Sequence, residues 1–155
     1  MASIFVARKH SNGNITYGNY LVDIWCLGLK DSHWEFNIDI SDWKEIKSQM
    51  REQGLNSQLV DYNLVHNIIY GGIAFADDYG FTPYKEFALS QYVLEEDDEK
   101  IQLIELEFGL DGIPHLVVFP MDSKAKAALK HLQANFSDDE FTFAMGDYDG
   151  RNMED

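Results

Sequence analysis

Three side chains of the kinds that catalyse hydrolysis lie in segments that are otherwise apolar. Asp23 is inside the run YLVDIWCLG, and His66 and Asp77 follow on one predicted helix. A histidine acts as a general base near neutral pH when a carboxylate lies beside it. One interpretation is therefore a small hydrolase or nuclease-like enzyme that uses Asp23, His66 and Asp77 in one pocket, with a divalent ion as an optional partner.

Asp23, His66 and the nearby Cys26 also have a structural interpretation, which we prefer. Asp23 would form an ion pair with Arg8 or Lys30, because a carboxylate in an apolar segment needs a partner. His66 would be a core histidine bonded to a tyrosine hydroxyl or a backbone carbonyl, and the single cysteine, Cys26, a small buried hydrophobe. We therefore predict no catalytic residue, no metal site and no cofactor. A P-loop and a dinucleotide fingerprint are both absent from the sequence.

Most of the charge lies in two short segments of a chain whose formal net charge is −15. Residues 94–107 contain seven carboxylates and one lysine, and residues 138–155 contain seven carboxylates and one arginine, so each segment carries −6. The carboxylates of the first segment are Glu95, Glu96, Asp97, Asp98, Glu99, Glu105 and Glu107. Those of the second are Asp138, Asp139, Glu140, Asp147, Asp149, Glu154 and Asp155.

This charge distribution suggests a binding protein. A strongly acidic surface repels nucleic acid and anionic membranes, and it attracts cationic proteins at raised association rates. We predict an acidic bacterial immunity or inhibitor protein that neutralises a basic toxin, such as a nuclease effector. Its interface would combine the carboxylates of both segments up to Asp149 with four aromatic anchors, Tyr92, Phe141, Phe143 and Tyr148.

Two other interpretations of the charge stay open. A nucleic-acid mimic that inhibits a DNA-binding protein would space its carboxylates like phosphates along one face. Alternatively, both segments are solvated loops without a partner. The N-terminal residues lack the features of a secretory signal, and no apolar run approaches the roughly 20 residues of a membrane span, so we expect a cytoplasmic protein.

The elements that must position these residues predict an α+β fold. Asn12-Gly13 separates two strand-like runs and predicts an opening hairpin, with a bulge or bend at Gly18 and a third strand at 33–38. Helices are predicted from a cap at Ser41 or Asp42 to Gly54, over residues 58–79, from Thr82-Pro83, and after Asp122. In the long helix, the pair Gly71-Gly72 indicates close approach of another backbone.

A second hairpin is predicted from the alternating run 101–108 and the run 113–119, which Gly109 to Gly112 separate. Residues 140–145 would add an edge strand. The prediction is a single α+β domain over residues 1–145, whose antiparallel or mixed sheet is built from two hairpins with helices packed on it. Residues 146–155 are predicted to be a flexible acidic tail.

Three blocks of the sequence also resemble an uncharacterised family of small bacterial proteins and protein segments. The blocks are YLVDIWCLGLKD (residues 20–31), YGGIAFADDYGFTPYKEF (residues 70–87) and LEEDDEKIQLIELEFGLDGIP (residues 94–114). The resemblance covers roughly residues 4–120 and implies either a shared core or a shared site. It carries over no catalytic role, because the family has no assigned reaction.

Overall fold

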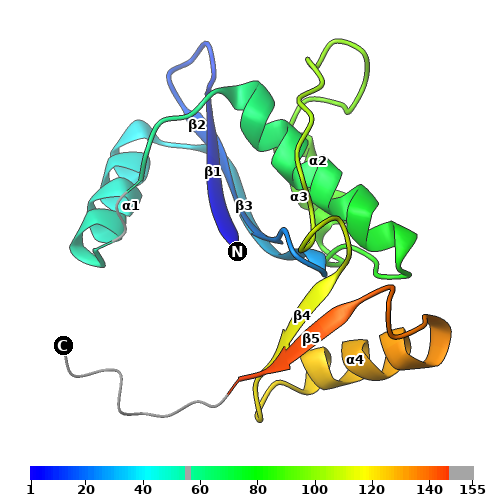
Figure 1. The fold of residues 1–155 in the computed structure, drawn as a ribbon. Coiled ribbons are helices and arrows are strands. Elements are labelled where there is room, and N and C mark those ends of the chain that lie inside the picture. Colours follow the sequence, from blue (N-terminus) through cyan, green and yellow to red (C-terminus); the bar gives the residue numbers. More distant parts are fainter. Residues whose placement is uncertain (55–56, 147–155) are drawn as a thin grey trace.

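The chain folds into an α+β structure, as predicted (Figure 1). A computed structural model of the chain describes residues 1–54 and 57–146. It contains a three-stranded antiparallel sheet, in the order β1-β2-β3, and a two-stranded parallel sheet, β4-β5. Among the described residues, no helix is long and apolar enough to cross a membrane. The predicted tail from residue 147 onward lies outside the described residues, so the domain boundary stays a prediction.

The predicted N-terminal hairpin is confirmed. Strands β1 (Ala2–Lys9) and β2 (Ile15–Asp23) pair antiparallel, and Gly13 in the turn has a φ of +89°. Strand β3 (Gly28–Ile38) is longer than expected because it begins directly after the turn at 24–27. The bulge predicted at Gly18 is wrong: Gly18 pairs regularly with Val6 and Trp34. A Cβ there would lie 2.6 Å from the Tyr20 hydroxyl oxygen, so the position needs glycine for the Tyr20 ring.

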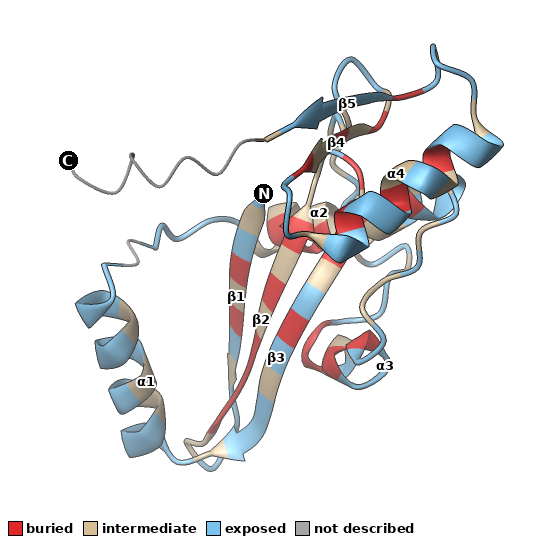
Figure 2. Ribbon diagram, turned by 90° about the horizontal axis from the view of Figure 1, so that it is seen from below, coloured by how far each residue is buried: buried red, intermediate tan, exposed pale blue. Residues whose placement is uncertain are grey.

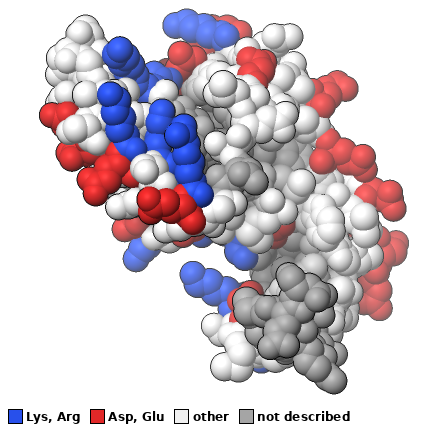
Figure 3. Space-filling model, turned by 90° about the vertical axis from the view of Figure 1, so that its left-hand side faces the viewer, with Lys and Arg blue, Asp and Glu red and all other residues white. Residues whose placement is uncertain are grey.

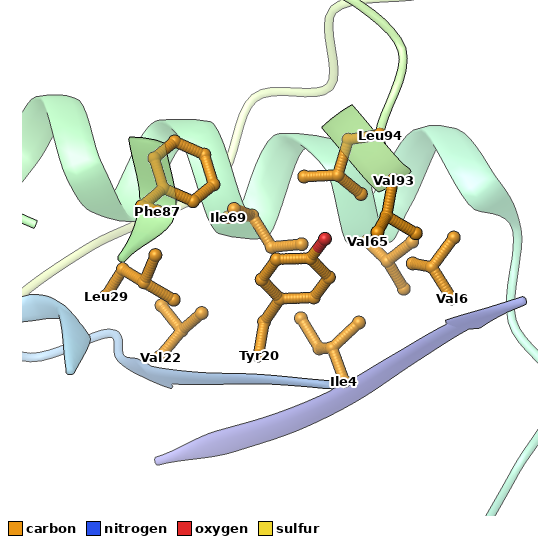
Figure 4. Close-up of a cluster of buried hydrophobic side chains, with 10 residues drawn as sticks. All are labelled: Ile4, Val6, Tyr20, Val22, Leu29, Val65, Ile69, Phe87, Val93 and Leu94. Carbon is orange, nitrogen blue, oxygen red and sulfur yellow. The ribbon is translucent and has the colours of Figure 1, made fainter. Parts of the chain in front are cut away.

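Helix α2 (Tyr62–Asp78) crosses one face of this sheet and closes the main core (Figure 4). The core combines residues of the sheet with residues of α2 and of the segment after it. It contains Ile4 and Val6 of β1, Tyr20 and Val22 of β2, Leu29 of β3, Val65 and Ile69 of α2, and Phe87, Val93 and Leu94. The buried face of α2 runs through Val65, Ile69, Gly72 and Ala76. Neighbouring Phe75 stacks on Phe108. Helix α2 is therefore covered on two sides, by the sheet and by the segment 101–108.

The second hairpin predicted from 101–108 and 113–119 does not form. Residues 102–108 are extended without a strand partner among the described residues, and one isolated bridge joins Leu110 to Ile113. Strand β4 (His115–Val118) pairs instead in parallel with β5 (Thr142–Met145), which confirms an edge strand near 140–145. Phe108 stacks on Phe75 of α2, and the Ile104 N–H bonds to the Asn67 side chain, so contacts with the helix take the place of strand pairing.

Helix α4 (Ser123–Asn135) connects β4 to β5 and covers one face of their sheet. Asp122 caps it as predicted, by accepting a hydrogen bond from the Ala125 N–H at 3.0 Å. A second core lies between the helix and the strands, and it contains Cys26, Leu116, Val118, Ala125, Ala128, Leu132 and Phe141. The two cores are joined at the end of α2, where the C-cap residue Tyr79 packs on Phe136.

Two helical segments differ in detail from the prediction. Helix α1 (Ile40–Glu52) is capped by Asp39 rather than Ser41 or Asp42 and has no buried residue (Figure 2). Its Trp43 ring lies 5.2 Å from the Tyr17 ring of β2. The helix expected from Thr82-Pro83 begins only at Phe87, as α3 (Phe87–Ser90), followed by the short 3-10 helix η1 (Gln91–Val93). Tyr84 donates its N–H to the Leu29 carbonyl, which holds 82–86 against β3 in a non-helical path.

Candidate functional site

The three residues of the enzyme interpretation do not meet in one pocket. His66 and Asp77 lie on the same helix eleven residues apart, which separates them by about 16 Å along its axis. His66 is fully buried, whereas Asp77 is exposed at the other end of α2. Catalytic partners must lie within hydrogen-bond reach or one bridging water of each other. The arrangement therefore gives His66 no role as a base activated by Asp77.

Asp23 has a structural role that differs from the predicted ion pair. Its carboxylate accepts hydrogen bonds from the backbone N–H groups of Trp25 and Leu27, both at 3.0 Å, and so closes the turn between β2 and β3. Neither Arg8 nor Lys30 lies within 4 Å of it among the ion pairs of the described residues. A turn carboxylate bonded to two N–H groups needs no cationic partner, which is why the pairing with Arg8 or Lys30 is wrong.

Cys26 lies in the turn that Asp23 closes, and its side chain is fully buried. Burial raises the pKa of its thiol to about 12, and the nearby charge of Asp23 adds to the effect. Because the thiolate is the reactive form of cysteine, this thiol is a poor nucleophile. The prediction that Cys26 serves as a small buried hydrophobe is confirmed.

His66 joins helix α2 to the first acidic segment. Its Nε2 donates a hydrogen bond to the carbonyl oxygen of Glu95 at 2.9 Å, because a carbonyl can only accept. The ring stacks on Tyr70 with a centroid separation of 4.6 Å. Within the described residues its Nδ1 is buried without a hydrogen-bond partner, and it lies 3.9 Å from an Asp97 carboxylate oxygen. The predicted core histidine bonded to a backbone carbonyl is thus confirmed.

Two further side chains of α2 hold the same segment by its backbone. The Tyr62 hydroxyl accepts a hydrogen bond from the Glu95 N–H at 2.9 Å. The Asn67 amide donates to the Gln102 carbonyl at 2.9 Å and accepts from the Ile104 N–H at 3.1 Å. The role of Asn67 was not predicted from the sequence, in which it is one of two asparagines one turn apart, Asn63 and Asn67. Residues 94–104 are therefore fixed to the N-terminal half of α2 at several points.

With the backbone held in this way, the carboxylates of the segment point outward. Glu95, Glu96, Asp97, Glu99, Glu105 and Glu107 are all exposed, and Asp98 is half-buried. Among the described residues, the one Lys or Arg within 4 Å of them is Arg8, at 3.9 Å from Glu95. Two apolar side chains accompany them, because Tyr92 is 71% exposed and Leu103 is 82% exposed. We call residues 92–107 the acidic face.

The second acidic segment lies apart from the acidic face. Its described carboxylates, Asp138, Asp139 and Glu140, follow α4, whose last turn packs against Tyr79 at the C-terminal end of α2. Tyr62, which holds the acidic face, is at the opposite end of α2, about 25 Å away along the helix axis. In Figure 3, acidic side chains follow the right-hand edge of the molecule, while the left side of the view mixes Lys and Arg with further acidic side chains. The two acidic segments do not form one compact rim.

Some of the predicted anchor residues need correction. Phe141 is 3% exposed and belongs to the core under α4, so it cannot contact a partner. Its neighbour Phe143 is 45% exposed on β5. Asp147, Tyr148 and Asp149 lie outside the described residues. Phe141 precedes β5 and packs in the core under α4 with Leu116 and Leu132, whereas all four residues of β5 are exposed, a difference that the sequence alone does not reveal.

The cavities of the molecule contain few of the predicted site residues. A groove of about 500 Å³ is lined by Leu29, Lys30, Phe81, Tyr84, Lys124 and His131, among others. A smaller hollow of about 280 Å³ beside it includes Asp23, Trp25, His115 and Asp122. In the part of the chain that the structure describes, no group of three or more His, Cys, Asp or Glu side chains is arranged to hold a metal ion.

The geometry defines an α+β protein that carries an exposed acidic face fixed to one helix. No family model matches the chain, and neither a curated protein nor a solved structure matches it. The resemblance of its three sequence blocks to a bacterial family therefore stays a prediction.

Proposed function

We propose that the chain is an acidic docking protein that binds a basic protein partner through the acidic face. In its specific form, the proposal is that the partner is a toxin with a cationic substrate groove, such as a nuclease, and that the chain neutralises it as an immunity protein. The observation that carries the proposal is the combination of exposed carboxylates with a backbone that Tyr62, His66 and Asn67 hold in place.

This combination matters because an interface gains affinity when its groups are already ordered before binding. A flexible acidic loop would lose conformational freedom on docking, whereas a fixed one loses little. The carboxylates would raise the association rate by attracting a cationic groove, since long-range steering depends on charge. Tyr92 and Leu103 would supply the apolar contacts that most interfaces need beside their charges.

The proposed interface is narrower than the one expected from the sequence. Asp138, Asp139 and Glu140 are exposed but lie beyond the far end of α2, so a partner seated on the acidic face would not need them. The two alternatives gain no comparable support. The enzyme residues do not converge, and the two acidic segments lie at opposite ends of α2 instead of forming the single row of carboxylates that a nucleic-acid mimic would need.

The test compares two triple variants that change the net charge equally. Glu99→Gln, Glu105→Gln and Glu107→Gln remove three charges from the acidic face, and none of these side chains makes a hydrogen bond to another described residue. Asp42→Asn, Glu45→Gln and Glu52→Gln remove three from helix α1, which serves as the matched control. Each protein is immobilised and exposed to lysate of the source cells at low salt, and the retained protein is then eluted with a salt gradient and identified.

The proposal expects one basic protein that the wild type and the α1 variant retain and the acidic-face variant loses. Its association rate should fall by about tenfold between 50 and 500 mM salt, because the attraction is screened. Co-expression should then protect a bacterial host from that protein if it is a toxin. Equal retention by both triple variants, or binding that is indifferent to salt, would contradict the proposal. A basic partner that is harmless to the host would contradict the role as an immunity protein but not the role as a docking protein.

A further inference from the structure

Among the described residues, strand β5 has an edge that no other strand covers. It is the outer strand of the two-stranded β4-β5 sheet (Figures 1 and 2). Thr142 and Gly146 donate their N–H groups to the carbonyls of Pro114 and Val118 at 2.8 Å. Since the backbone groups of alternate residues point to opposite edges of a strand, those of Phe143 and Met145 point to the free edge. Within the described residues, neither has a backbone partner outside the sheet.

Nothing in the sequence of β5 protects this edge. Natural edge strands are commonly blunted by charged side chains, proline or a bulge. Strand β5 reads Thr-Phe-Ala-Met, has no charged residue or proline, and pairs with β4 in regular register. Phe143 is 45% exposed and Met145 is 61% exposed. An open, uncharged and apolar edge is a template on which another strand can pair.

The side chains of this edge extend a buried surface. Phe143 pairs with Leu116 and Met145 with Val118, so each lies on the same face as its partner. Leu116 and Val118 are buried under α4, whereas the two β5 residues lie outside this cover. A strand added beside β5 would continue the sheet and cover Phe143 and Met145 with its own apolar side chains.

The charges nearby indicate which kind of strand fits. Asp138, Asp139 and Glu140 immediately precede β5 and are exposed, and no Lys or Arg pairs with them among the described residues. A second copy of this chain would bring a further net charge of −15 to the interface. A strand with Lys or Arg beside its apolar residues would instead be attracted.

We propose that β5 is a docking edge for an extended segment of another protein, with alternating apolar side chains flanked by Lys or Arg. This surface is separate from the acidic face, and the proposal does not rest on the proposed function. Backbone hydrogen bonds to Phe143 and Met145 would supply part of the affinity, and the flanking charges would supply the preference for a basic segment.

The experiment uses the full chain and a synthetic peptide, acetyl-Lys-Lys-Val-Thr-Val-Thr-Val-Lys-Lys-amide. A second peptide with glutamate in place of each lysine is the charge control. Amide chemical shifts and hydrogen exchange are followed by NMR during titration. The proposal expects shift changes and added protection at the Phe143 and Met145 amides, and weaker binding of the glutamate peptide by about tenfold or more.

Two variants at one position separate a backbone contact from a side-chain contact. Met145→Pro removes an N–H that faces the free edge and leaves the bonds to β4, so it should weaken binding by about tenfold. Met145→Leu keeps that N–H and should bind within about twofold of the wild type. The β4 and α4 amide signals of each variant show whether the sheet is intact.

The wild-type titration decides the matter even if Met145→Pro disturbs the sheet. Absence of any effect at Phe143 and Met145, or equal binding of the glutamate peptide, would overturn the proposal. Sedimentation of the chain alone tests whether the edge binds another protein or a second copy of the chain. A monomer at all concentrations is expected, and a dimer that Met145→Pro abolishes would assign the edge to a second copy and overturn the choice of partner.

Discussion

Gly28 and Gly72 meet backbone to backbone where strand β3 begins under helix α2. A Cβ on Gly28 would lie 2.7 Å from the Gly72 carbonyl oxygen and 2.9 Å from the Ala76 Cβ, and the φ of Gly28 is +67°. The contact explains the glycine at position 72, and a Cβ on Gly71 would instead lie 2.7 Å from the Phe108 ring, so each glycine has a packing reason that offsets its cost of about 1 kcal/mol. The Gly28–Gly72 contact fixes the C-terminal half of α2, the helix that carries the acidic face at its other end, against the sheet.

Replacing Gly28 tests this contact. Gly28→Ala should lower the free energy of unfolding by about 3 kcal/mol, because it adds a steric overlap to the strain of a positive φ. Gly13→Ala is the matched control, since Gly13 also has a positive φ but no atom lies within 4 Å of its Cβ position. It should cost about 1 kcal/mol. Urea unfolding measures both, and equal losses would show that the Gly28–Gly72 contact contributes nothing.

A buried hydrogen bond joins β2 to α3. The Tyr20 hydroxyl donates to the Ser90 carbonyl at 2.6 Å inside the main core (Figure 4). Tyr20→Phe leaves this carbonyl without its donor and should cost about 2 kcal/mol of stability by urea unfolding. Tyr84→Phe removes a comparable but exposed bond to Glu86 and should change stability by less than about 0.5 kcal/mol. A Tyr20→Phe protein as stable as the wild type would refute the assignment.

The hydrogen bonds between Asn67 and the acidic face can be removed without changing any charge. Asn67→Ala deletes the bonds to Gln102 and Ile104 and should cost about 1 to 2 kcal/mol. Hydrogen exchange at the 102–106 amides should become faster than in the wild type under native conditions. Asn135→Ala, which removes bonds made within α4 alone, should leave exchange in this segment unchanged. Unchanged exchange in Asn67→Ala would mean that other contacts hold the acidic face.

Cys26 should be inert in the folded protein. Burial raises the pKa of its thiol to about 12, so almost no thiolate forms at pH 8. Labelling with dithionitrobenzoate should be slow in native buffer and complete within seconds in 6 M guanidinium chloride. Between these limits, the labelling rate should follow the unfolded fraction measured by circular dichroism. Rapid and complete labelling of the native protein would show that the turn around Cys26 opens independently.

Buried tyrosines should make the protein sensitive to alkaline pH. Burial is the main cause that raises the pKa of Tyr17 and of Tyr70 to about 12, with nearby carboxylates adding to it. An unfolded tyrosine ionises near pH 10. The folded state therefore holds these protons more tightly, so their contribution to stability is complete below about pH 10 and is lost as the pH rises toward 12.

Urea unfolding at several pH values between 8 and 11.5 measures this loss. The midpoint should fall above pH 10, in parallel with tyrosinate absorbance at 295 nm. Tyr70→Phe removes one of these groups and should make the fall less steep. A midpoint that does not change up to pH 11.5 would contradict the proposed burial of these hydroxyl groups.

Local sequence signals predicted the elements that form from neighbouring residues. The Asn12-Gly13 turn specifies the first hairpin because the two strands adjoin it, and Asp122 specifies the start of α4 through its own side chain. The pairing of β4 with β5 was missed because the two strands are separated by a helix, so no turn residue records it. The alternation of Ile104, Leu106 and Phe108 was misassigned because packing on a helix needs the same alternation as a strand does.

The candidate site was also predicted only in part, because its charges are visible in the sequence but its long-range contacts are not. Exposed carboxylates are visible in a sequence, since runs of like charge stay at the surface. Their arrangement depends on Tyr62, His66 and Asn67, whose partners are backbone groups about 30 residues later. Phe141 was assigned to the surface because its neighbours are acidic, although a helix on the other side of β5 covers it.

The position of β5 in the chain also determines the order in which the molecule can assemble. Strands β1, β2 and β3 are consecutive, so their sheet can form as soon as residue 38 has left the ribosome. The core under α4 needs Phe141, which is synthesised about a hundred residues later. Until then, Leu116 and Val118 have no strand beside them. We therefore expect the C-terminal third to be the last part to fold during synthesis and the first to need protection by chaperones.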